Sequence, residues 1–439
     1  MTPGRPPRHL GLVDATALYA GIILGSGIFV APAAVAAAAP SLPSALALWL
    51  AGAVIAACGA SCYAECSSRV PESGGFFVFQ QRAFGPAVAW VGGWAAIFIT
   101  YPASIAAIAM IFASYFTEAT GLAGWERPVG AAALVAAAAL NAAGLRTGPV
   151  AQRVLTALKL AALAAVALAA LTAPAADPVS RPATGMDAVT WLGALLLLLW
   201  SYEGWSDVTL VTGELRDPRR NLGRAVLAGT AILVVVYGLT QAAVMHALGG
   251  AAAASSRPVA EATAAAWGPG AGRLVAALVV VSTFGSILGV TLTVSRLAQA
   301  MAEGGAVLRT VAPFHPRLGT PVRAIAIVTG ASLVYVAVAS FRGILAYFTF
   351  SVWIFYGLTA VCVFVLRKRR VGEAEAWRAP LGPVAPVVVL GVALAVTAQV
   401  VAGRPAEALA GAGMLLAGFV AYAVVRRFAG VGGAGARAR

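Results

Sequence analysis

Long apolar runs separated by short polar loops dominate this chain of 439 residues. A membrane-crossing helix needs about 20 apolar residues in a row. Twelve runs meet this length, so the pattern predicts an all-α integral membrane protein with twelve transmembrane helices. The predicted spans are residues 14–38, 44–68, 86–117, 128–145, 153–173, 187–213, 224–248, 272–300, 323–341, 344–366, 382–402 and 406–425.

Basic residues give these spans an orientation. All but seven of the 30 Lys and Arg residues lie in the predicted loops on the side of the termini. The seven others are Arg127, Arg181, Arg257, Arg273, Arg342 and Arg404 on the opposite side and Lys159 within a span. Cytoplasmic loops carry the excess of Lys and Arg in membrane proteins, so we expect cytoplasmic tails at residues 1–13 and 426–439.

Composition excludes several classes of function. Hydrophobic residues make up 61% of the chain and charged residues 10%, which is typical of a protein in contact with membrane lipid. The net charge of +14 is spread over short clusters, so we expect no nucleic-acid partner. The sequence contains no Cys/His metal spacing and no phosphate-binding loop of the Walker type. We therefore expect no metal, no cofactor and no enzymatic activity.

Two of the predicted spans are interrupted by residues that a lipid-facing helix does not tolerate. The first contains "GSGIF" at 25–29, and the sixth contains "WSYEGW" at 200–205, followed by Asp207. The interruptions lie five spans apart, and five is odd, so a repeated unit has the opposite membrane orientation. Matching broken helices indicate an inverted-repeat transporter. The predicted repeats are residues 14–173 and 187–366, with two additional helices in 382–425.

A broken helix indicates a binding site, because unpaired backbone groups inside a membrane cost several kcal/mol each. The glycines at 25–27 leave amide N–H groups at a half-helix N-terminus, which favours a carboxylate. Carbonyls released around Ile23, Trp200 and Glu203 would suit an ammonium group. The two breaks together predict a site for a zwitterion. The alternative is that the glycines only permit close helix packing.

The sequence leaves two interpretations open for each of three side chains. Lys159 either extends toward the cytoplasmic end of its helix or donates to carbonyls of the unwound first helix in place of a coupling cation. Glu203 either senses substrate charge or a proton, or lies in a hydrated vestibule. Trp200 either closes an access path or packs as an ordinary ring. We expect Glu65 and Glu214, near helix ends, to pair with nearby arginines.

Several motifs resemble the amino acid–polyamine–organocation superfamily, and within it the L-type amino acid transporters and their bacterial relatives. They are "GIILGSGIFVAP" (21–32), "PESGGFFVFQQRAFGP" (71–86), "TALKLAAL" (156–163) and "WSYEGWSDVTLVTGELRDPRRNLGRA" (200–225). The resemblance implies a leucine-transporter-type fold with a 5+5 inverted repeat, discontinuous helices 1 and 6, and two extra C-terminal helices.

The resemblance also implies roles for single residues. Ser26 and Gly27 would bind the substrate carboxylate, and Trp200 would be the aromatic gate. Lys159 would replace the sodium ion of sodium-coupled relatives. Glu203 stands where many neutral-selective members have Gly, which leaves the specificity class open. The predicted substrate-binding residues are Ile23, Gly25, Ser26, Gly27, Trp200, Ser201 and Glu203.

These observations predict a sodium-independent transporter of small to medium neutral L-amino acids that works by alternating access, as an exchanger, in a bacterial inner membrane. We expect a monomer. The loop at 117–128 lacks a cysteine, so we expect no disulfide-linked heavy chain. One alternative is a cationic amino acid or polyamine carrier, which Glu203 favours and the lack of further acids in the predicted pocket argues against. Another is a membrane sensor that binds amino acids, although we expect no appended signalling domain.

Overall fold

In a computed structural model, every regular element of the described residues is helical, apart from one isolated β-bridge between Leu10 and Leu215. This confirms the predicted all-helical class. The structure describes residues 10–39, 41–72, 74–143, 149–172, 174–176, 188–303, 315, 320–373, 376–380 and 382–429.

The helices follow the predicted apolar runs closely. Those of the N-terminal half are α1 (Leu12–Ile23), η1 (Gly27–Phe29), α2 (Ala31–Ala38), α3 (Leu42–Arg69), α4 (Phe76–Phe84), α5 (Pro86–Ala95), the π-helical turn η2 (Ala96–Thr100), α6 (Tyr101–Thr120), α7 (Glu126–Ala142) and α8 (Pro149–Leu171). Those of the C-terminal half are α9 (Ala188–Ser201), η3 (Asp207–Glu214), α10 (Pro218–Leu248), η4 (Gly249–Ala254), α11 (Pro258–Trp267), α12 (Pro269–Glu303), α13 (Val322–Val338), α14 (Phe341–Lys368), α15 (Val384–Gly403) and α16 (Pro405–Ala429).

Seven helical segments among the described residues are long and apolar enough to cross a membrane without interruption. They are Leu42–Arg69, Pro86–Thr120, Pro218–Ala254, Pro269–Thr291, Gly343–Lys368, Val384–Gly403 and Pro405–Arg426. The predicted first and sixth spans do not qualify because both are broken. The protein is therefore a multi-pass membrane protein, and its twelve crossings remain a prediction.

The structure differs from the predicted pattern in three places. The short helices α4 and α11 were missed, because both lie outside the membrane-length runs. The second half of the sixth span is the 3₁₀-helix η3, not α-helix. Here the hydroxyl of Thr209 donates to the carbonyl of Ser206 (2.6 Å), and that of Thr212 donates to the carbonyl of Thr209 (2.7 Å). Such bonds over three residues compete with α-helical geometry.

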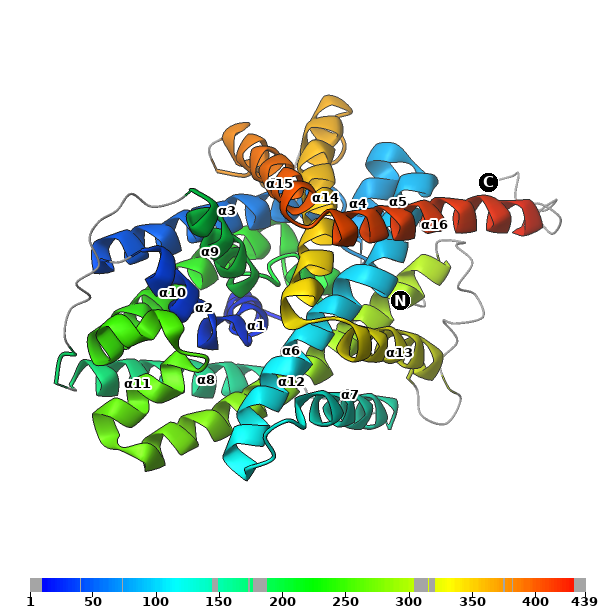
Figure 1. Ribbon diagram of the computed structural model, residues 1–439. Coiled ribbons are helices and arrows are strands. Elements are labelled where there is room, and N and C mark those ends of the chain that lie inside the picture. Colours follow the sequence, from blue (N-terminus) through cyan, green and yellow to red (C-terminus); the bar gives the residue numbers. More distant parts are fainter. Residues whose placement is uncertain are drawn as a thin grey trace.

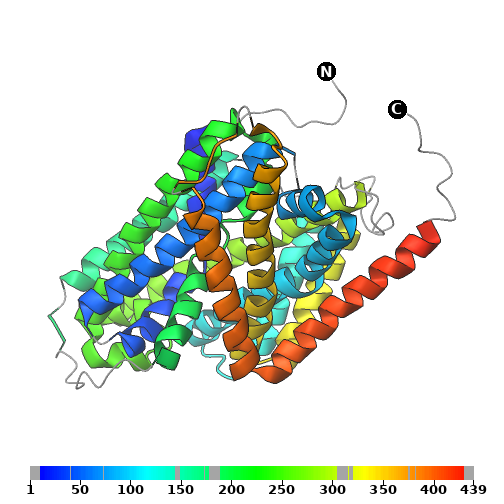
Figure 2. The same cartoon turned by 90° about the horizontal axis from the view of Figure 1, so that it is seen from above.

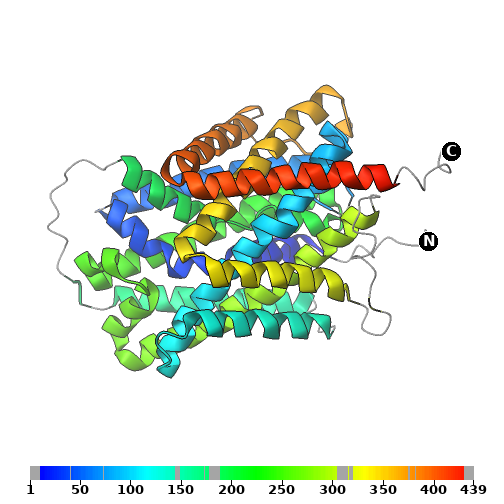
Figure 3. The same ribbon diagram turned by 45° about the vertical axis from the view of Figure 1, so that its right-hand side comes forward.

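The broken first segment lies at the centre of the molecule. Figure 1 shows α1 and α2 in blue, with α3, α6, α8 and α10 around them. Helix α1 packs on α8 and α10, and α2 packs on α9. The two C-terminal helices lie outside this group: α15 packs on α14 and α3, and α16 runs along one side of the molecule, against α5 (Figures 2 and 3). Exposed apolar side chains on α16, such as Leu409 and Leu416, suit contact with lipid.

A buried ionic cluster fixes one end of α3 to α14. Glu65 has no exposed surface and accepts hydrogen bonds from Arg69 (3.0 Å), from Arg367 (2.6 and 2.8 Å) and from the backbone N–H of Ala379 (2.9 Å). This confirms the predicted pairing of Glu65 with arginines. The side chain of Glu214 lies outside the described residues.

Replacing Glu65 with Gln should lower the free energy of unfolding by about 3 kcal/mol or more, because two arginines lose their buried counter-charge. The midpoint of thermal unfolding in detergent measures this loss. Glu72→Gln is the matched control, since the Glu72–Arg82 pair is about half exposed on both sides and is worth at most about 1 kcal/mol. Equal midpoints for the two variants would contradict a structural role for the cluster.

Candidate functional site

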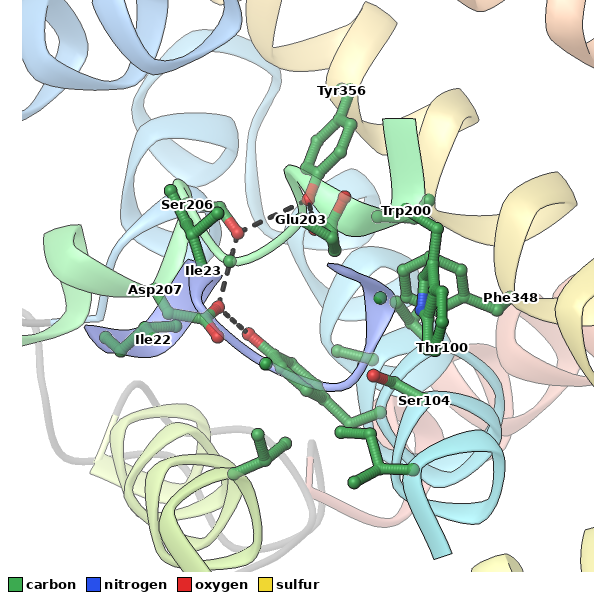
Figure 4. Close-up of a pocket in the computed structure, with 18 of the residues that line it drawn as sticks. Ile22, Ile23, Thr100, Ser104, Trp200, Glu203, Ser206, Asp207, Phe348 and Tyr356 are labelled. Atoms are coloured by element: carbon green, nitrogen blue, oxygen red, sulfur yellow. Dashed lines mark hydrogen bonds between the residues drawn. The ribbon is translucent and has the colours of Figure 1, made fainter. Parts of the chain in front are cut away.

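A cavity lies where the two helix breaks meet. Helix α1 ends at Ile23 and the chain resumes helical form at Gly27, while α9 ends at Ser201 and η3 begins at Asp207. Both breaks line the cavity together with side chains from α3, α6, α12 and α14 (Figure 4). Among the predicted site residues, those that line it are Ile23, Gly25, Ser26, Gly27, Trp200 and Glu203.

The first break presents backbone donors to this cavity. Ser26 is buried and stands directly before η1, in helical backbone conformation. Within the described part of the chain, the amide N–H groups of Ser26 and Gly27 have no hydrogen-bond acceptor. Buried amides without acceptors are rare in folded proteins and indicate a ligand or water at that position. The arrangement is suited to an anionic group.

Two glycines allow the breaks to approach each other. A Cβ on Gly27 would lie 2.5 Å from the Cα of Ser201, and a Cβ on Gly204 would lie 2.6 Å from the Cγ2 of Ile22. Gly204 also has a φ of 112°, which side chains disfavour. The structure places the predicted residue Ser201 in this contact, outside the cavity lining. Its hydroxyl donates to the carbonyl of Leu197 (3.1 Å).

Carbonyls of both breaks already accept hydrogen bonds from the protein. The carbonyl of Ile23 accepts from the N–H of Gly25 (2.6 Å) and from the hydroxyl of Tyr237 (3.2 Å), which also lies 3.0 Å from the carbonyl of Ser201. The carbonyl of Trp200 accepts from the N–H of Glu203 (3.1 Å). Tyr237 was not predicted. Its signal is a tyrosine inside an apolar span, whose hydroxyl needs a partner.

Lys159 reaches the first break from α8. Its Nζ lies 3.5 Å from the carbonyl of Leu24, the residue at the C-terminal end of α1. This is the contact expected if the ammonium group donates to the unwound segment. Lys159 itself does not line the cavity.

A second acid lines the cavity, contrary to the expectation that Glu203 has no acidic neighbour there. Asp207 accepts hydrogen bonds from the hydroxyl of Tyr101 (2.8 Å) and from that of Ser206 (3.2 Å). Glu203 accepts from the hydroxyl of Tyr356. The expectation failed because Asp207, the first residue after the second break, also lines the cavity.

The cavity has a carboxyl end and an aromatic end. In Figure 4, Asp207 and Ser206 lie on one side, whereas Trp200, Phe348, Thr100 and Ser104 lie on the other. The aromatic end combines two rings with two hydroxyl groups and carries no charge. This is a suitable surface for a small or medium side chain.

The fold and the cavity define a multi-pass membrane protein whose central pocket is built from two broken helices. The chain belongs to the amino acid permease family of the amino acid–polyamine–organocation superfamily, because the sequence model of that family matches residues 10–425. This confirms the resemblance found in the sequence motifs.

Relatives within this family are transporters. The chain is 29% identical to the mouse b(0,+)-type amino acid transporter 1, over 94% of this chain and 87% of the relative. It is 28% identical to the serine/threonine exchanger SteT of Bacillus subtilis, over 87% and 89% respectively. It is 31% identical to the mouse Asc-type amino acid transporter 1, over 83% and 71%. Permeases and exchangers, not enzymes, are therefore the class to which the chain is similar.

Gly27→Ala should separate the two breaks, because the added methyl group overlaps Ser201. We expect at least a tenfold loss of amino acid binding, measured by scintillation proximity on purified protein, together with a lower unfolding temperature. Gly193→Ala is the matched control, since a Cβ there meets nothing within 4 Å on α9. Wild-type binding by Gly27→Ala would show that the close approach of the breaks is not needed.

Proposed function

We propose that this protein carries small to medium neutral L-amino acids across a bacterial inner membrane. Amino acid transport itself follows from the family and its relatives. The observation that carries the proposal is the pair of buried amides at Ser26 and Gly27, which lack acceptors within the described residues and belong to residues that line the cavity at the first break. They would bind the substrate carboxylate, while the carbonyls of Trp200 and Glu203, and that of Ile23 when Tyr237 donates to Ser201 instead, would bind its ammonium group.

The same proposal covers the membrane arrangement. Twelve crossings with both termini in the cytoplasm, repeats at 14–173 and 187–366, and two extra helices would make the two breaks symmetry mates near the midplane. Alternating access would then move the broken segments against more static helices such as α6 and α14. Trp200, at the aromatic end of the cavity, would be the gate. A monomer without a disulfide-linked partner suffices for this mechanism.

Sodium independence is supported by Lys159. Its ammonium group lies at the carbonyl of Leu24, where the first helix unwinds, so it supplies there the positive charge that a coupling cation would otherwise provide. The ammonium group is covalently attached, so no ion from solution is needed at this position. Exchange of one amino acid for another is the mode we expect, as in the serine/threonine exchanger to which the chain is similar.

A cationic amino acid or polyamine is the second candidate substrate. Glu203 and Asp207 both line the cavity and give it two carboxyl groups. A side-chain ammonium or guanidinium group would be attracted to that end. Both carboxyl groups already accept hydrogen bonds from hydroxyls of the protein, which is why we rank this candidate below neutral amino acids.

Counterflow in proteoliposomes tests the proposed function directly. Vesicles loaded with one unlabelled amino acid at a time, or with a polyamine, should accumulate a labelled neutral amino acid only when the internal compound is itself a substrate. We expect small and medium neutral amino acids to support accumulation equally with and without sodium. Accumulation of labelled arginine or of a labelled polyamine, with no accumulation of any labelled neutral amino acid, would establish the second candidate instead.

Lys159→Ala should reduce counterflow at least tenfold, because the unwound end of α1 loses its fixed positive charge. The amount of folded protein, checked by size-exclusion chromatography in detergent, should stay the same. Lys368→Ala is the matched control, because Lys368 is the other lysine of the chain and is exposed at the end of α14. Full counterflow by Lys159→Ala would remove the ion-replacement role.

A further inference from the structure

We propose that Glu203 and Asp207, linked through the hydroxyls of Ser206 and Tyr356, share one proton that crosses the membrane with each neutral amino acid. This inference rests on the proposed function of the same cavity and goes beyond exchange. It adds a net uptake mode, driven by a proton gradient, that needs no amino acid on the inner side.

Five side chains form a continuous chain of oxygen atoms along the carboxyl end of the cavity. The Tyr101 hydroxyl lies 2.8 Å from the Oδ1 of Asp207, which lies 3.2 Å from the Oγ of Ser206. The Oγ of Ser206 lies 3.5 Å from the hydroxyl of Tyr356, and this hydroxyl contacts the Oε1 of Glu203. Figure 4 shows the contacts as dashed lines between α6, the second break and α14.

Counting hydrogens shows that this chain is one proton short when both acids are ionised. Four contacts join the five oxygen groups. A hydroxyl has one hydrogen to donate and an ionised carboxylate has none. Tyr101, Ser206 and Tyr356 therefore supply three hydrogens for the four contacts. When all three hydrogens point to the carboxylates, the contact between Ser206 and Tyr356 (3.5 Å) holds no hydrogen, and two negative charges stay buried in the cavity, which is unfavourable.

One added proton satisfies every contact. If it binds the Oε1 of Glu203, then Glu203 donates to Tyr356, Tyr356 donates to Ser206, and Ser206 donates to Asp207. If it binds the Oδ1 of Asp207, the three donations run in the opposite direction. The hydrogen bond from Tyr101 to Asp207 exists in both cases. The two carboxyl groups thus act as a single site for one proton, which reaches it from water on the open side.

No basic side chain in the described lining balances the charge of these two acids. Among the described residues, the cavity lining contains no Lys, Arg or His. Lys159 points to the carbonyl of Leu24, outside the lining. A zwitterionic substrate brings no net charge, so it cannot balance two ionised acids. The proton lowers the charge of the site from two negative groups to one.

The titratable side chains that the surrounding helices contribute to the cavity lining are all phenols. Helix α3 presents Tyr63, α6 presents Tyr101 and α14 presents Tyr356. The lining residues of α1 and α12 are not titratable. On α1, Tyr19 pairs with Thr230 (2.9 Å) instead. Near neutral pH, the carboxyl pair is therefore the group in this cavity that gains and loses a proton.

The five oxygen groups lie on different elements, and this couples binding of the proton to the movement of the broken segments. Glu203, Ser206 and Asp207 belong to the second break, whereas Tyr101 and Tyr356 belong to the uninterrupted helices α6 and α14. If the broken segments move against these helices during alternating access, both acids part from their phenol donors. The affinity of the pair for its proton then differs between the two orientations, which is the requirement for coupling.

Net uptake into vesicles that contain no amino acid tests the inference. A pH-sensitive dye inside proteoliposomes, with alanine, serine or threonine added outside, reports proton movement. Wild-type protein should acidify the lumen by about one proton per amino acid taken up, and uptake should fall as the external pH rises. Uptake without acidification, at a rate independent of pH, would overturn the inference.

Variants test whether these five oxygen groups hold the proton. Glu203→Gln supplies an amide hydrogen to Tyr356 and cannot titrate, so lumen acidification should be lost. Tyr356→Phe removes the link between the acids and should shift the pH dependence of uptake. Tyr335→Phe is the matched control, since it removes a buried phenol that contacts the carbonyl of Phe98 (3.4 Å), outside the chain. Undiminished acidification by Glu203→Gln would overturn the assignment.

The two proposals fail in different ways. Counterflow that persists while net uptake into empty vesicles does not acidify the lumen would contradict the proton site and leave amino acid exchange intact. Absence of counterflow with every amino acid would contradict the proposed function, and the proton site would fall with it.

Discussion

Backbone polar groups inside a membrane need partners, and this constraint governs the whole central region. Each helix break releases N–H and carbonyl groups that the helix would otherwise pair, at a cost of several kcal/mol per group. The protein satisfies most of them itself. The hydroxyl of Tyr237 lies within hydrogen-bond distance of a carbonyl from each break and donates to one of them at a time, and Lys159 donates to the carbonyl of Leu24. The amides of Ser26 and Gly27 remain without acceptors in the described chain, and we propose that a substrate carboxylate binds there.

The two helix breaks lie close to each other because glycines stand where they meet. Gly27 and Gly204 bring the backbone of one break against side chains of the other, so the two ends of a bound zwitterion would meet donors and acceptors from different halves of the chain. The second break, residues 202–206, contains Glu203 and ends directly before Asp207. Movement of this one segment would therefore affect the proposed substrate site and the proposed proton site together.

Sequence alone predicted the breaks and the part of the lining contributed by Ile23, Gly25, Ser26, Gly27, Trp200 and Glu203, because glycines and acids inside apolar runs are local signals. It could not predict partners that are remote along the chain. Tyr101 and Tyr356 lie more than a hundred residues from the acids that they contact, and nothing local marks either tyrosine as polar-paired. Asp207 was visible as an acid, but its place in the cavity, beside Tyr101, depends on the packing of helices that are remote in the sequence. Ser201 was expected in the lining and lies in the helix contact instead.

The central claim is that both ends of the amino acid backbone are bound by the breaks, the carboxylate at Ser26 and Gly27 and the ammonium group at the carbonyls. Competition for binding of a labelled neutral amino acid tests it most directly, using the unlabelled amino acid, the amine that lacks its carboxylate and the acid that lacks its amino group. The account predicts that the intact amino acid competes and that neither single-ended analogue does. Competition by either analogue at the concentration of the intact amino acid would contradict it.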